Sequence, residues 1–394
     1  MTTTPNPQEL HAPDEDTRLH LREDLLAWFD EHQRDLPWRK TSDPYAIWVS
    51  EIMLQQTQVI TVKDYYTRWM QTFPDVQSLA SADRDDVMKM WAGLGYYRRA
   101  RSLHEGAQMV VDDFDGSLPS DVKGLKKIKG IGKYTAGAIS SIAFDQVEPL
   151  VDGNVERVFA RLFAIPGDPK QTSNQKLFWS IARDLVDPLR PGDFNQSLME
   201  LGAVCCTPKS PTCLLCPVRE HCKAHALGDT ASYPAKVKRA KAKPVQSESL
   251  VIIANTPTPQ VLLYKRSGDG LLAGLMEAPS TPHSPRDTRY NKSNAMTRLA
   301  SLFESEGLGI PLDSSVLASA KHVGYVKHLF SHLDMRIHIF LVELDAWPDG
   351  FVDTLETSPS WSLVSTEELS HQALSKAQKK VFRSALSSRE SSSD

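Results

Sequence analysis

Apolar residues recur at spacings of three and four along the chain from Thr17 to about Gly228. The clearest run comprises Leu21, Leu25, Ala27 and Trp28, and then Ile47, Ile52, Leu54 and Val59. This is the period of an amphipathic α-helix. Asp43 followed by Pro44 is typical of a helix start, with a capping carboxylate and a proline in the first turn. The pattern predicts an all-helical region over this part of the chain.

The pattern changes after a basic stretch, Ala235 to Pro244, which holds lysine and arginine but no acidic residue. Short β-type runs follow at 250–254, 261–264 and 335–341, and helical patterns appear around 295–306 and 366–387. Mixed elements of this kind predict an α+β domain. The basic stretch itself is typical of a solvated connector that also contacts phosphate.

The chain is therefore expected to have two domains joined by a linker. We expect a helical domain at 18–228, a basic linker at 229–246 and an α+β domain at 247–387. The polar ends, 1–17 and 388–394, are expected to be disordered tails.

Composition narrows the class of protein. A chain of 394 residues exceeds a single small module, and 41% hydrophobic with 24% charged residues is ordinary for a globular protein. The formal charge of -4 implies that any contact with nucleic acid uses local patches. The acidic start of the chain resembles neither a secretion signal nor a transit peptide, so we expect an intracellular protein without a membrane partner.

The five cysteines all fall between Cys205 and Cys222. A disulfide framework would spread its cysteines through the fold, so this clustering favours a metal site. The spacing C-x6-C-x2-C-x5-C, formed by Cys206, Cys213, Cys216 and Cys222, favours a cubane iron–sulfur cluster. Structural zinc is the alternative, although zinc ribbons usually carry two C-x2-C pairs. Cys205 is expected to have no ligand role.

Gly130-Ile-Gly132 forms a predicted turn between two helices. Four lysines surround it, Lys126, Lys127, Lys129 and Lys133. Glycines permit positive φ angles with outward N–H groups beside the positive end of the second helix. The glycines alone also fit a simple helical corner, but the lysines favour a DNA backbone contact. We expect Lys129, Gly130, Gly132 and Lys133 to bind DNA.

The chain carries the Gly130–Gly132 turn between two helices and, after it, the C-x6-C-x2-C-x5-C motif. In this it resembles the helix-hairpin-helix DNA glycosylases of the endonuclease III superfamily. Within it, the chain resembles the adenine DNA glycosylases of the MutY family. The matching stretches are Leu36–Arg39, Val49–Val59, Trp91–Tyr97, Val151–Val158 and Met199–Gly202. The resemblance implies an all-α helix-hairpin-helix glycosylase domain with a [4Fe-4S] loop at 206–222, followed by a smaller α+β Nudix-like domain.

Cleavage of an N-glycosidic bond leaves an oxocarbenium-like sugar and an anionic base, so it needs an acid on one side and a negative charge on the other. Glu51 lies in an otherwise apolar helix, where burial would keep it protonated. The resemblance implies that Glu51 is the acid and that Asp152 stabilises or captures the sugar, with Asn154 beside it. Taken singly, Glu51 also fits a solvated position and Asp152-Gly-Asn154 also fits a helix cap.

Tyr134 marks a departure from the superfamily. Bifunctional members carry the pattern G-x-G-x-Lys and use that lysine as a nucleophile. This chain has Tyr134 at the position of the lysine, and a tyrosine cannot form an imine. Strand-cutting lyase activity is therefore not expected. Lys133, one residue earlier, would point about 100° away on the helix, towards phosphate. We expect Tyr134 to form a hydrogen bond near Glu51 or Asp152.

An adenine must leave the base stack before its glycosidic bond is cleaved, and side chains must fill the space that the base leaves in the duplex. The group expected to do so consists of Gln55, Gln56, Thr57 and Tyr96. The resemblance implies that the adenine pocket includes Trp38, Arg39 and Glu200. As alternatives, the glutamines fit an exposed helix face, Tyr96 fits a core position, and a Trp-Arg pair often only packs.

The second domain resembles the Nudix-like module of the same family through Leu271–Glu277 and His328–Leu333. A Nudix hydrolase needs a glutamate-rich helix for Mg²⁺, whereas this chain carries Pro279, Pro282 and Pro285 after that motif. Hydrolysis of nucleotides is therefore not expected. Phe330, Ser331 and His332 match the loop that reads 8-oxoguanine, although the run also fits a plain strand end.

The resemblance thus implies a monofunctional enzyme of base excision repair that hydrolyses adenine paired with 8-oxoguanine or guanine. The partner is double-stranded DNA holding such a mispair, and downstream abasic-site repair and replication factors would follow. We expect a monomer, in the nucleus of a eukaryote or the cytoplasm and nucleoid of a bacterium. The alternatives are a bifunctional pyrimidine glycosylase with lyase action and a non-catalytic iron–sulfur DNA-binding protein.

Overall fold

The computed structural model describes residues 13–236, 241–267, 270–286, 291–305, 314–356 and 358–390. The chain divides into two compact units: Met1–Ala82 with Arg101–Lys238, and Asp83–Ala100 with Arg239–Asp394. Part of each expected tail, 1–12 and 391–394, and residues 237–240 of the expected linker lie outside the described residues.

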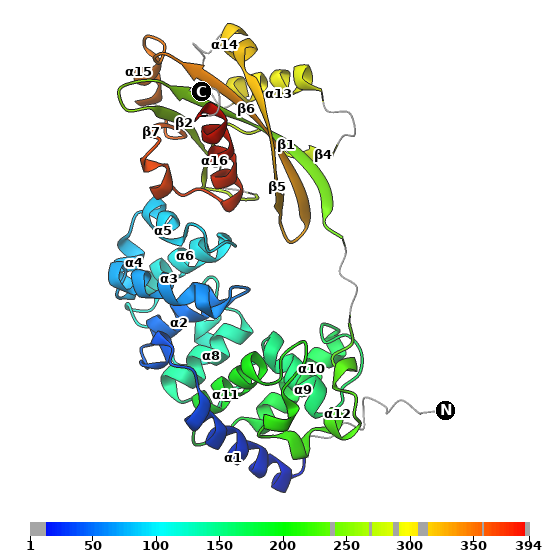
Figure 1. Cartoon of the computed structure of the whole chain (residues 1–394). Coiled ribbons are helices and arrows are strands. Elements are labelled where there is room, and N and C mark those ends of the chain that lie inside the picture. Colours follow the sequence, from blue (N-terminus) through cyan, green and yellow to red (C-terminus); the bar gives the residue numbers. More distant parts are fainter. Residues whose placement is uncertain are drawn as a thin grey trace. The chain divides into compact units, whose positions relative to one another are not determined.

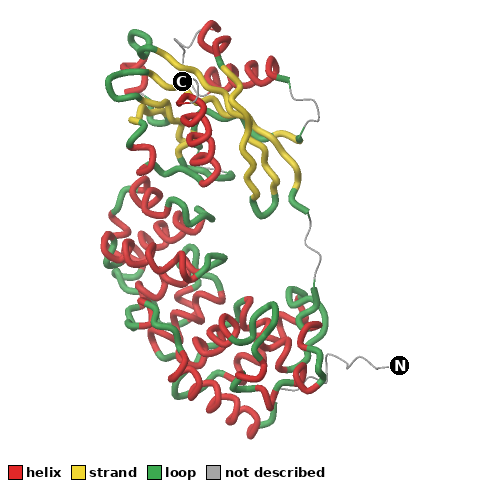
Figure 2. Tube along the Cα trace, in the orientation of Figure 1, coloured by secondary structure: helices red, strands yellow, loops and turns green. Residues whose placement is uncertain are grey.

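The first unit is built from helices, as Figure 2 shows in red. Its longer helices are α1 (Glu15–His32), α2 (Pro44–Leu54), α3 (Val59–Thr72), α4 (Val76–Ser81), α8 (Lys133–Phe144), α9 (Gly153–Leu162), α10 (Thr172–Leu185) and α11 (Pro191–Val204). Helix α6 (Arg98–Asp113) belongs mostly to this unit, and α5 (Arg84–Trp91) belongs to the second. Short turns complete it: η2 (Pro37–Arg39), α7 (Val122–Leu125), η3 (Cys213–Leu215), η4 (Arg219–His221), α12 (Lys223–Ala226) and η5 (Thr230–Ser232). The predicted helical fold is confirmed.

Carboxylate caps fix several helix starts. Asp43 caps α2 by accepting from two backbone N–H groups, with Pro44 at the first position, as the sequence predicts. Asp14 caps α1 by accepting from the backbone N–H of Thr17. Helix α1 therefore begins at Glu15, inside the stretch expected to be a disordered tail, and that expectation is wrong for residues 15–17.

One hydrophobic cluster of the first unit lies among α1, α9, α10 and α11. Its largest buried side chains are those of Phe159, Phe178 and Phe194. Helix α11 approaches the start of α9 closely, because a Cβ added at Gly202 would lie 2.6 Å from the Cβ of Asn154. This contact places the side chains of α11 beside the segment that follows Asp152.

The second unit contains a seven-stranded sheet with the order β3-β2-β1-β6-β5, to which β4 and β7 add on β1 and β2. The strands are β1 (Lys243–Ala254), β2 (Gln260–Lys265), β3 (Met276–Glu277), β4 (Ser284–Pro285), β5 (Lys321–Leu329), β6 (Leu333–Leu344) and β7 (Trp361–Ser365). The central β1–β6 pair is parallel, and the other pairs are antiparallel. The predicted α+β fold is confirmed.

Helices cover both faces of this sheet (Figure 1). On one face, α16 (Lys376–Glu390) packs Val381 and Phe382 against residues such as Ile339. On the other face, α13 (Lys292–Ser305) and α14 (Ser314–Ser319) join a cluster that holds Leu250 and Phe340. The remaining helical segments are α15 (Phe351–Glu356) and η6 (Glu368–His371).

Three expected boundaries of the second domain are wrong. Residues 243–246, expected in the linker, belong to β1 because they pair with β6. The helical pattern at 366–387 covers a longer region than the helix, since α16 begins only at Lys376, where the Ser375 hydroxyl accepts from the N–H of Gln378. Residues 388–390, expected in the tail, continue α16, and Arg389 pairs with Glu343 at 3.2 Å.

No helix among these described segments is long and apolar enough to cross a membrane.

Candidate active site

A cavity of about 920 Å³ opens in the first unit between α2, α8, the start of α9 and α11. All four predicted catalytic residues line it: Glu51, Tyr134, Asp152 and Asn154. Glu51 comes from α2, Tyr134 from the first turn of α8, and Asp152 from the cap of α9. The two carboxylates, about a hundred positions apart in sequence, therefore share one space.

Glu51 is 5% exposed, and its Oε2 accepts a 2.5 Å hydrogen bond from the hydroxyl of Tyr134. Burial raises the pKa of Glu51 to about 7, against the hydrogen bond from Tyr134, which lowers it. The negative charge of Asp152 also raises this pKa, and Arg39 lowers it. A carboxyl group in this setting holds a proton near neutral pH, as a general acid must.

Asp152 has a different environment. Its Oδ1 accepts from the backbone N–H groups of Asn154 at 2.9 Å and Val155 at 2.7 Å, and its Oδ2 accepts from the Asn154 side chain at 3.0 Å. Burial raises the pKa of Asp152, whereas these donors and Arg157 lower it. The positive end of α9 adds to the donors. Burial outweighs these donors, so the pKa of Asp152 lies above its ordinary value, but three N–H groups contact this carboxylate whereas a tyrosine hydroxyl contacts that of Glu51.

Trp38, Arg39 and Glu200, the predicted adenine pocket, line the same cavity. Glu200 is 1% exposed, and both of its carboxylate oxygens accept from arginines: Arg34 at 2.7 Å and Arg39 at 2.8 Å. Burial alone would raise the pKa of Glu200, but the hydrogen bonds from the two arginines hold it at about 2. Sequence reasoning missed Arg34, which lies just outside the Leu36–Arg39 motif.

The segment after α2 also reaches the cavity through Gln55, Gln56 and Thr57. Gln56 is exposed with a φ of 57°, a left-handed conformation that few residues other than glycine adopt. The amide of Gln55 donates to the Thr135 hydroxyl at 3.4 Å. The segment thus brings two glutamine side chains and a threonine side chain to the lining of the cavity.

The two glycines of the turn, for which the sequence gives the same expectation, differ in conformation and in surroundings. Gly130 has a φ of 88°, and an added Cβ would lie 3.0 Å from the Cβ of Ser102. Gly132 has a φ of -91°, so the expected positive φ is wrong at this position. An added Cβ at Gly132 would have no neighbour within 4 Å, which leaves its backbone open to an outside molecule.

The two lysines of this turn that are expected to bind DNA, Lys129 and Lys133, both contact side chains of the protein. The Nζ of Lys129 lies 2.5 Å from Glu105, and that of Lys133 lies 3.6 Å from the centroid of the Trp179 ring. Lys133 and Trp179 both line the cavity, whereas Lys129 is not among its lining residues. Sequence reasoning missed Trp179, since a lone tryptophan on a helix fits the core equally well.

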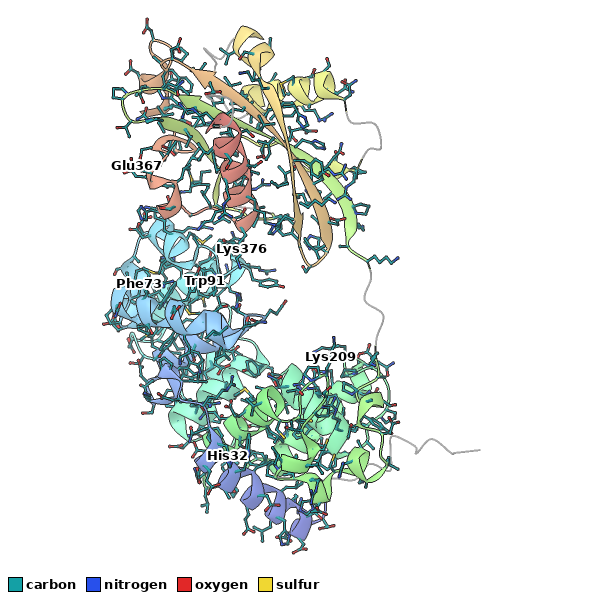
Figure 3. All side chains as sticks on the ribbon, viewed as in Figure 1. His32, Phe73, Trp91, Lys209, Glu367 and Lys376 are labelled. Atoms are coloured by element: carbon teal, nitrogen blue, oxygen red, sulfur yellow. The ribbon has the colours of Figure 1, made fainter. Side chains whose placement is uncertain are left out.

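The four predicted ligands, Cys206, Cys213, Cys216 and Cys222, line a separate small cavity together with Cys205. Lys209, labelled in Figure 3, lies in the loop between the first two. None of the described residues form a group of three or more side chains placed to hold a single metal ion. Thiols that surround a space suit a sulfur-bridged cluster, and the residues present fit such a group.

Two arginines on α9 connect this loop to the active site. Arg161 is 4% exposed and donates to the Cys206 carbonyl at 3.3 Å and the Thr207 carbonyl at 2.7 Å. Arg157 donates to the Cys206 carbonyl at 2.8 Å and to the Asn154 side chain at 2.9 Å. Asn154 in turn donates to Asp152, so hydrogen bonds run without a break from the cysteine loop to the carboxylate.

The other predicted residues belong to the second unit. Phe330, Ser331 and His332 form the turn between β5 and β6, where the N–H of Phe330 donates to the Leu333 carbonyl at 2.8 Å. Phe330 packs against the core, and Ser331 and His332 are exposed. Tyr96 is 47% exposed with a φ of 48°. Residues 270–286 form β3, β4 and loops, and no helix follows the Nudix-like motif within them.

Comparisons with known proteins agree with this architecture. Residues 49–183 match the HhH-GPD superfamily of base excision DNA repair proteins, and residues 250–384 match the NUDIX domain. An adenine DNA glycosylase from Rattus norvegicus is 40% identical over 412 residues, which cover 92% of this chain and 77% of the relative. That of Schizosaccharomyces pombe is 35% identical over 96% of this chain and 92% of its own length.

The chain belongs to the adenine DNA glycosylase family. It is an enzyme of base excision repair that cleaves the N-glycosyl bond of adenine. A solved thermostable thymine-DNA glycosylase is also similar, with a TM-score of 0.50, 30% identity and coverage of 54% of this chain and 98% of its own. The helical unit thus carries the glycosylase fold, and the family assignment extends through both units.

Proposed function

We propose that this glycosylase acts on double-stranded DNA in which adenine faces 8-oxoguanine or guanine, and that it hydrolyses adenine without cutting the strand. The observation that carries the proposal is the cavity shared by Glu51 and Asp152. Its volume of about 920 Å³ exceeds that of a purine, which leaves room for an extruded nucleotide.

In this proposal Glu51, protonated by virtue of its burial, donates a proton to a ring nitrogen of the extruded adenine. The bond between C1′ and the base then breaks, and its electron pair leaves with adenine. Asp152, held by three N–H donors, stabilises the cationic sugar until water adds at C1′. Glu200 and its two arginines offer fixed charges that orient the base beside Trp38.

Binding of the duplex uses the exposed backbone at Gly132, while Gln56 and Thr57 occupy the gap left by the extruded base. The exposure of Gln56, which also has a left-handed backbone, supports this role, because its side chain is accessible to an outside molecule.

A [4Fe-4S] cluster, held by Cys206, Cys213, Cys216 and Cys222, completes the first unit. When bound, the cluster supplies a rigid inorganic crosslink for the loop. Arg157 and Arg161 anchor that loop to α9 through the Cys206 carbonyl, which supports a structural role near Asp152.

Recognition of 8-oxoguanine is assigned to Ser331 and His332, whose exposed side chains at a hairpin tip are suited to read a base edge. The test is single-turnover release of adenine from duplexes with A opposite 8-oxoguanine, guanine or thymine. We expect release from the first two and none from A:T. Replacement of Ser331 and His332 by alanine should reduce the preference for 8-oxoguanine over guanine, and an unchanged preference would contradict the assignment.

Absence of strand cutting is tested separately. Borohydride traps an imine between a lysine and the abasic sugar, and Tyr134 cannot form one. We expect no trapped complex with the wild-type enzyme. Efficient trapping would instead favour the bifunctional alternative.

A further inference from the structure

The hydroxyl of Tyr134 has two acceptors within reach. One is Oε2 of Glu51 at 2.5 Å, and the other is Sδ of Met199 at 3.3 Å. A tyrosine hydroxyl carries a single proton, so it donates to only one of them at a time. Met199 is on α11, lines the catalytic cavity and packs at the edge of the core.

The protonation state of Glu51 decides which acceptor is used. When Glu51 is ionised, Tyr134 donates to the carboxylate. When Glu51 carries its proton on Oε2, that O–H needs an acceptor, and the Tyr134 oxygen is the partner at 2.5 Å. The hydroxyl proton of Tyr134 must then turn elsewhere, and the thioether sulfur of Met199 is a weak acceptor at the right distance.

We propose that Met199 is a positioning residue for the catalytic acid: its sulfur accepts the Tyr134 hydroxyl proton while Glu51 is protonated, and so favours the loaded form of the acid. The inference rests on the proposed role of Glu51 and deepens it. Without the sulfur, the form of Glu51 that is protonated on Oε2 would leave the buried Tyr134 hydroxyl without an acceptor, whereas the ionised form would lose nothing.

Glu51 is faced by titratable and charged groups from three other segments. Tyr134 approaches from α8, Asp152 from the start of α9, and Arg39 from η2. Asp152 favours the protonated form of Glu51, and Arg39 favours the ionised form. Met199 carries no charge, so its replacement alters the hydrogen bonds around Tyr134 and leaves these charges in place.

The test is the pH dependence of single-turnover adenine release from an A:G duplex. Met199→Leu keeps the approximate volume but removes the acceptor. We expect the midpoint of the fall in rate at high pH to move down by about half a pH unit. Met199→Gln restores an oxygen acceptor, and its midpoint should return to the wild-type value or above it.

A double-mutant cycle separates this role from packing. In a Tyr134→Phe background there is no hydroxyl proton to accept, so Met199→Leu should leave the midpoint unchanged. An equal shift with and without the Tyr134 hydroxyl would overturn the proposal, and so would an unchanged midpoint in Met199→Leu alone. If the leucine variant does not fold, a Met199→Gln midpoint below that of the wild-type enzyme overturns it.

Different results would refute the proposed function and this inference. A wild-type enzyme that releases no adenine from A:G or A:8-oxoguanine duplexes would refute the proposed function. An active wild-type enzyme whose pH profile of adenine release is unchanged by Met199→Leu would refute this inference alone.

Discussion

Tyr134 donates a 2.5 Å hydrogen bond to Glu51 across 83 positions of sequence. Tyr134 is the second residue of α8, and α8 begins directly after the glycine turn. The turn that is expected to meet a DNA phosphate and the side chain that contacts the acid therefore belong to one rigid element. The start of one helix therefore joins the turn proposed to contact DNA to the side chain that contacts the proposed acid.

Replacement of Glu51 by glutamine is expected to stabilise the fold at alkaline pH. Burial raises the pKa of Glu51 to about 7 from 4.5, so the folded chain binds this proton more tightly than the unfolded chain. The stability linked to the proton is present at low pH and is lost as pH rises from about 4.5 through about 7. Glutamine does not ionise, and its advantage should approach about 3 kcal/mol above that window. Unfolding in denaturant across this range measures it, and a pH-independent difference would contradict it.

Glu200→Gln should show the opposite dependence. The arginine hydrogen bonds hold the pKa of Glu200 at about 2, below the ordinary 4.5, despite its burial. The contribution of Glu200 to the free energy of unfolding is therefore present above about pH 4.5 and is lost as pH falls towards 2. The variant should be less stable than the wild type by about 3 kcal/mol at neutral pH, since Arg39 then lacks a counter-charge. Equal stability of the two proteins at pH 7 would count against this ion-pair network.

The two glycines of the turn should respond differently to alanine. Gly130→Ala places a Cβ 3.0 Å from Ser102 at a φ of 88°, so we expect a loss of at least about 1 kcal/mol of stability. Gly132→Ala meets no neighbour within 4 Å and should fold normally. Its effect should appear as weaker DNA binding, because the new methyl group keeps the phosphate away. Thermal unfolding and DNA titration of both variants check this, and normal DNA affinity in Gly132→Ala would exclude the contact.

Arg161→Lys should loosen the cysteine loop. Lysine cannot reproduce the donors that reach Cys206, Thr207 and Tyr233 together. We expect the purified variant to hold less iron and acid-labile sulfide than the wild-type protein. Arg22→Lys is the matched control, since Arg22 also binds three carbonyls, those of residues 184–186, none of which belongs to the cysteine loop. A similar loss of iron in both variants would indicate general destabilisation instead.

Periodicity and caps predicted most of the fold. The helices around Glu51 and Asp152 follow directly from apolar spacing and from the caps at Asp43 and Asp152. Boundaries failed where tertiary pairing decided them, as at residues 243–246, which become a strand only because β6 lies beside them. Within 366–375, where the sequence pattern predicts a helix, the chain instead forms the short η6 segment and an isolated bridge between Leu374 and Met276.

The residues proposed for catalysis stand in two specific sequence motifs, but the geometry that brings them together was not available from sequence. No local signal indicates that Arg34 would reach Glu200, because 166 positions separate them. Met199 and Trp179 have ordinary core-like spacing, and only the packing of α10 and α11 brings them to the cavity. Long-range contacts of this kind depend on how helices pack, which local patterns do not determine.

The pairing of a protonated Glu51 with a charged Asp152 is tested most directly by single-turnover release of adenine from an A:G duplex. Glu51→Gln and Asp152→Asn should each lower the rate by about 100-fold or more, while the mispaired duplex still binds. Glu156→Gln is the control, since Glu156 is equally buried, lines the same cavity and pairs with Lys170. Its rate should stay within about tenfold of the wild type. A Glu51→Gln enzyme that releases adenine as fast as this control would contradict the assignment of the acid.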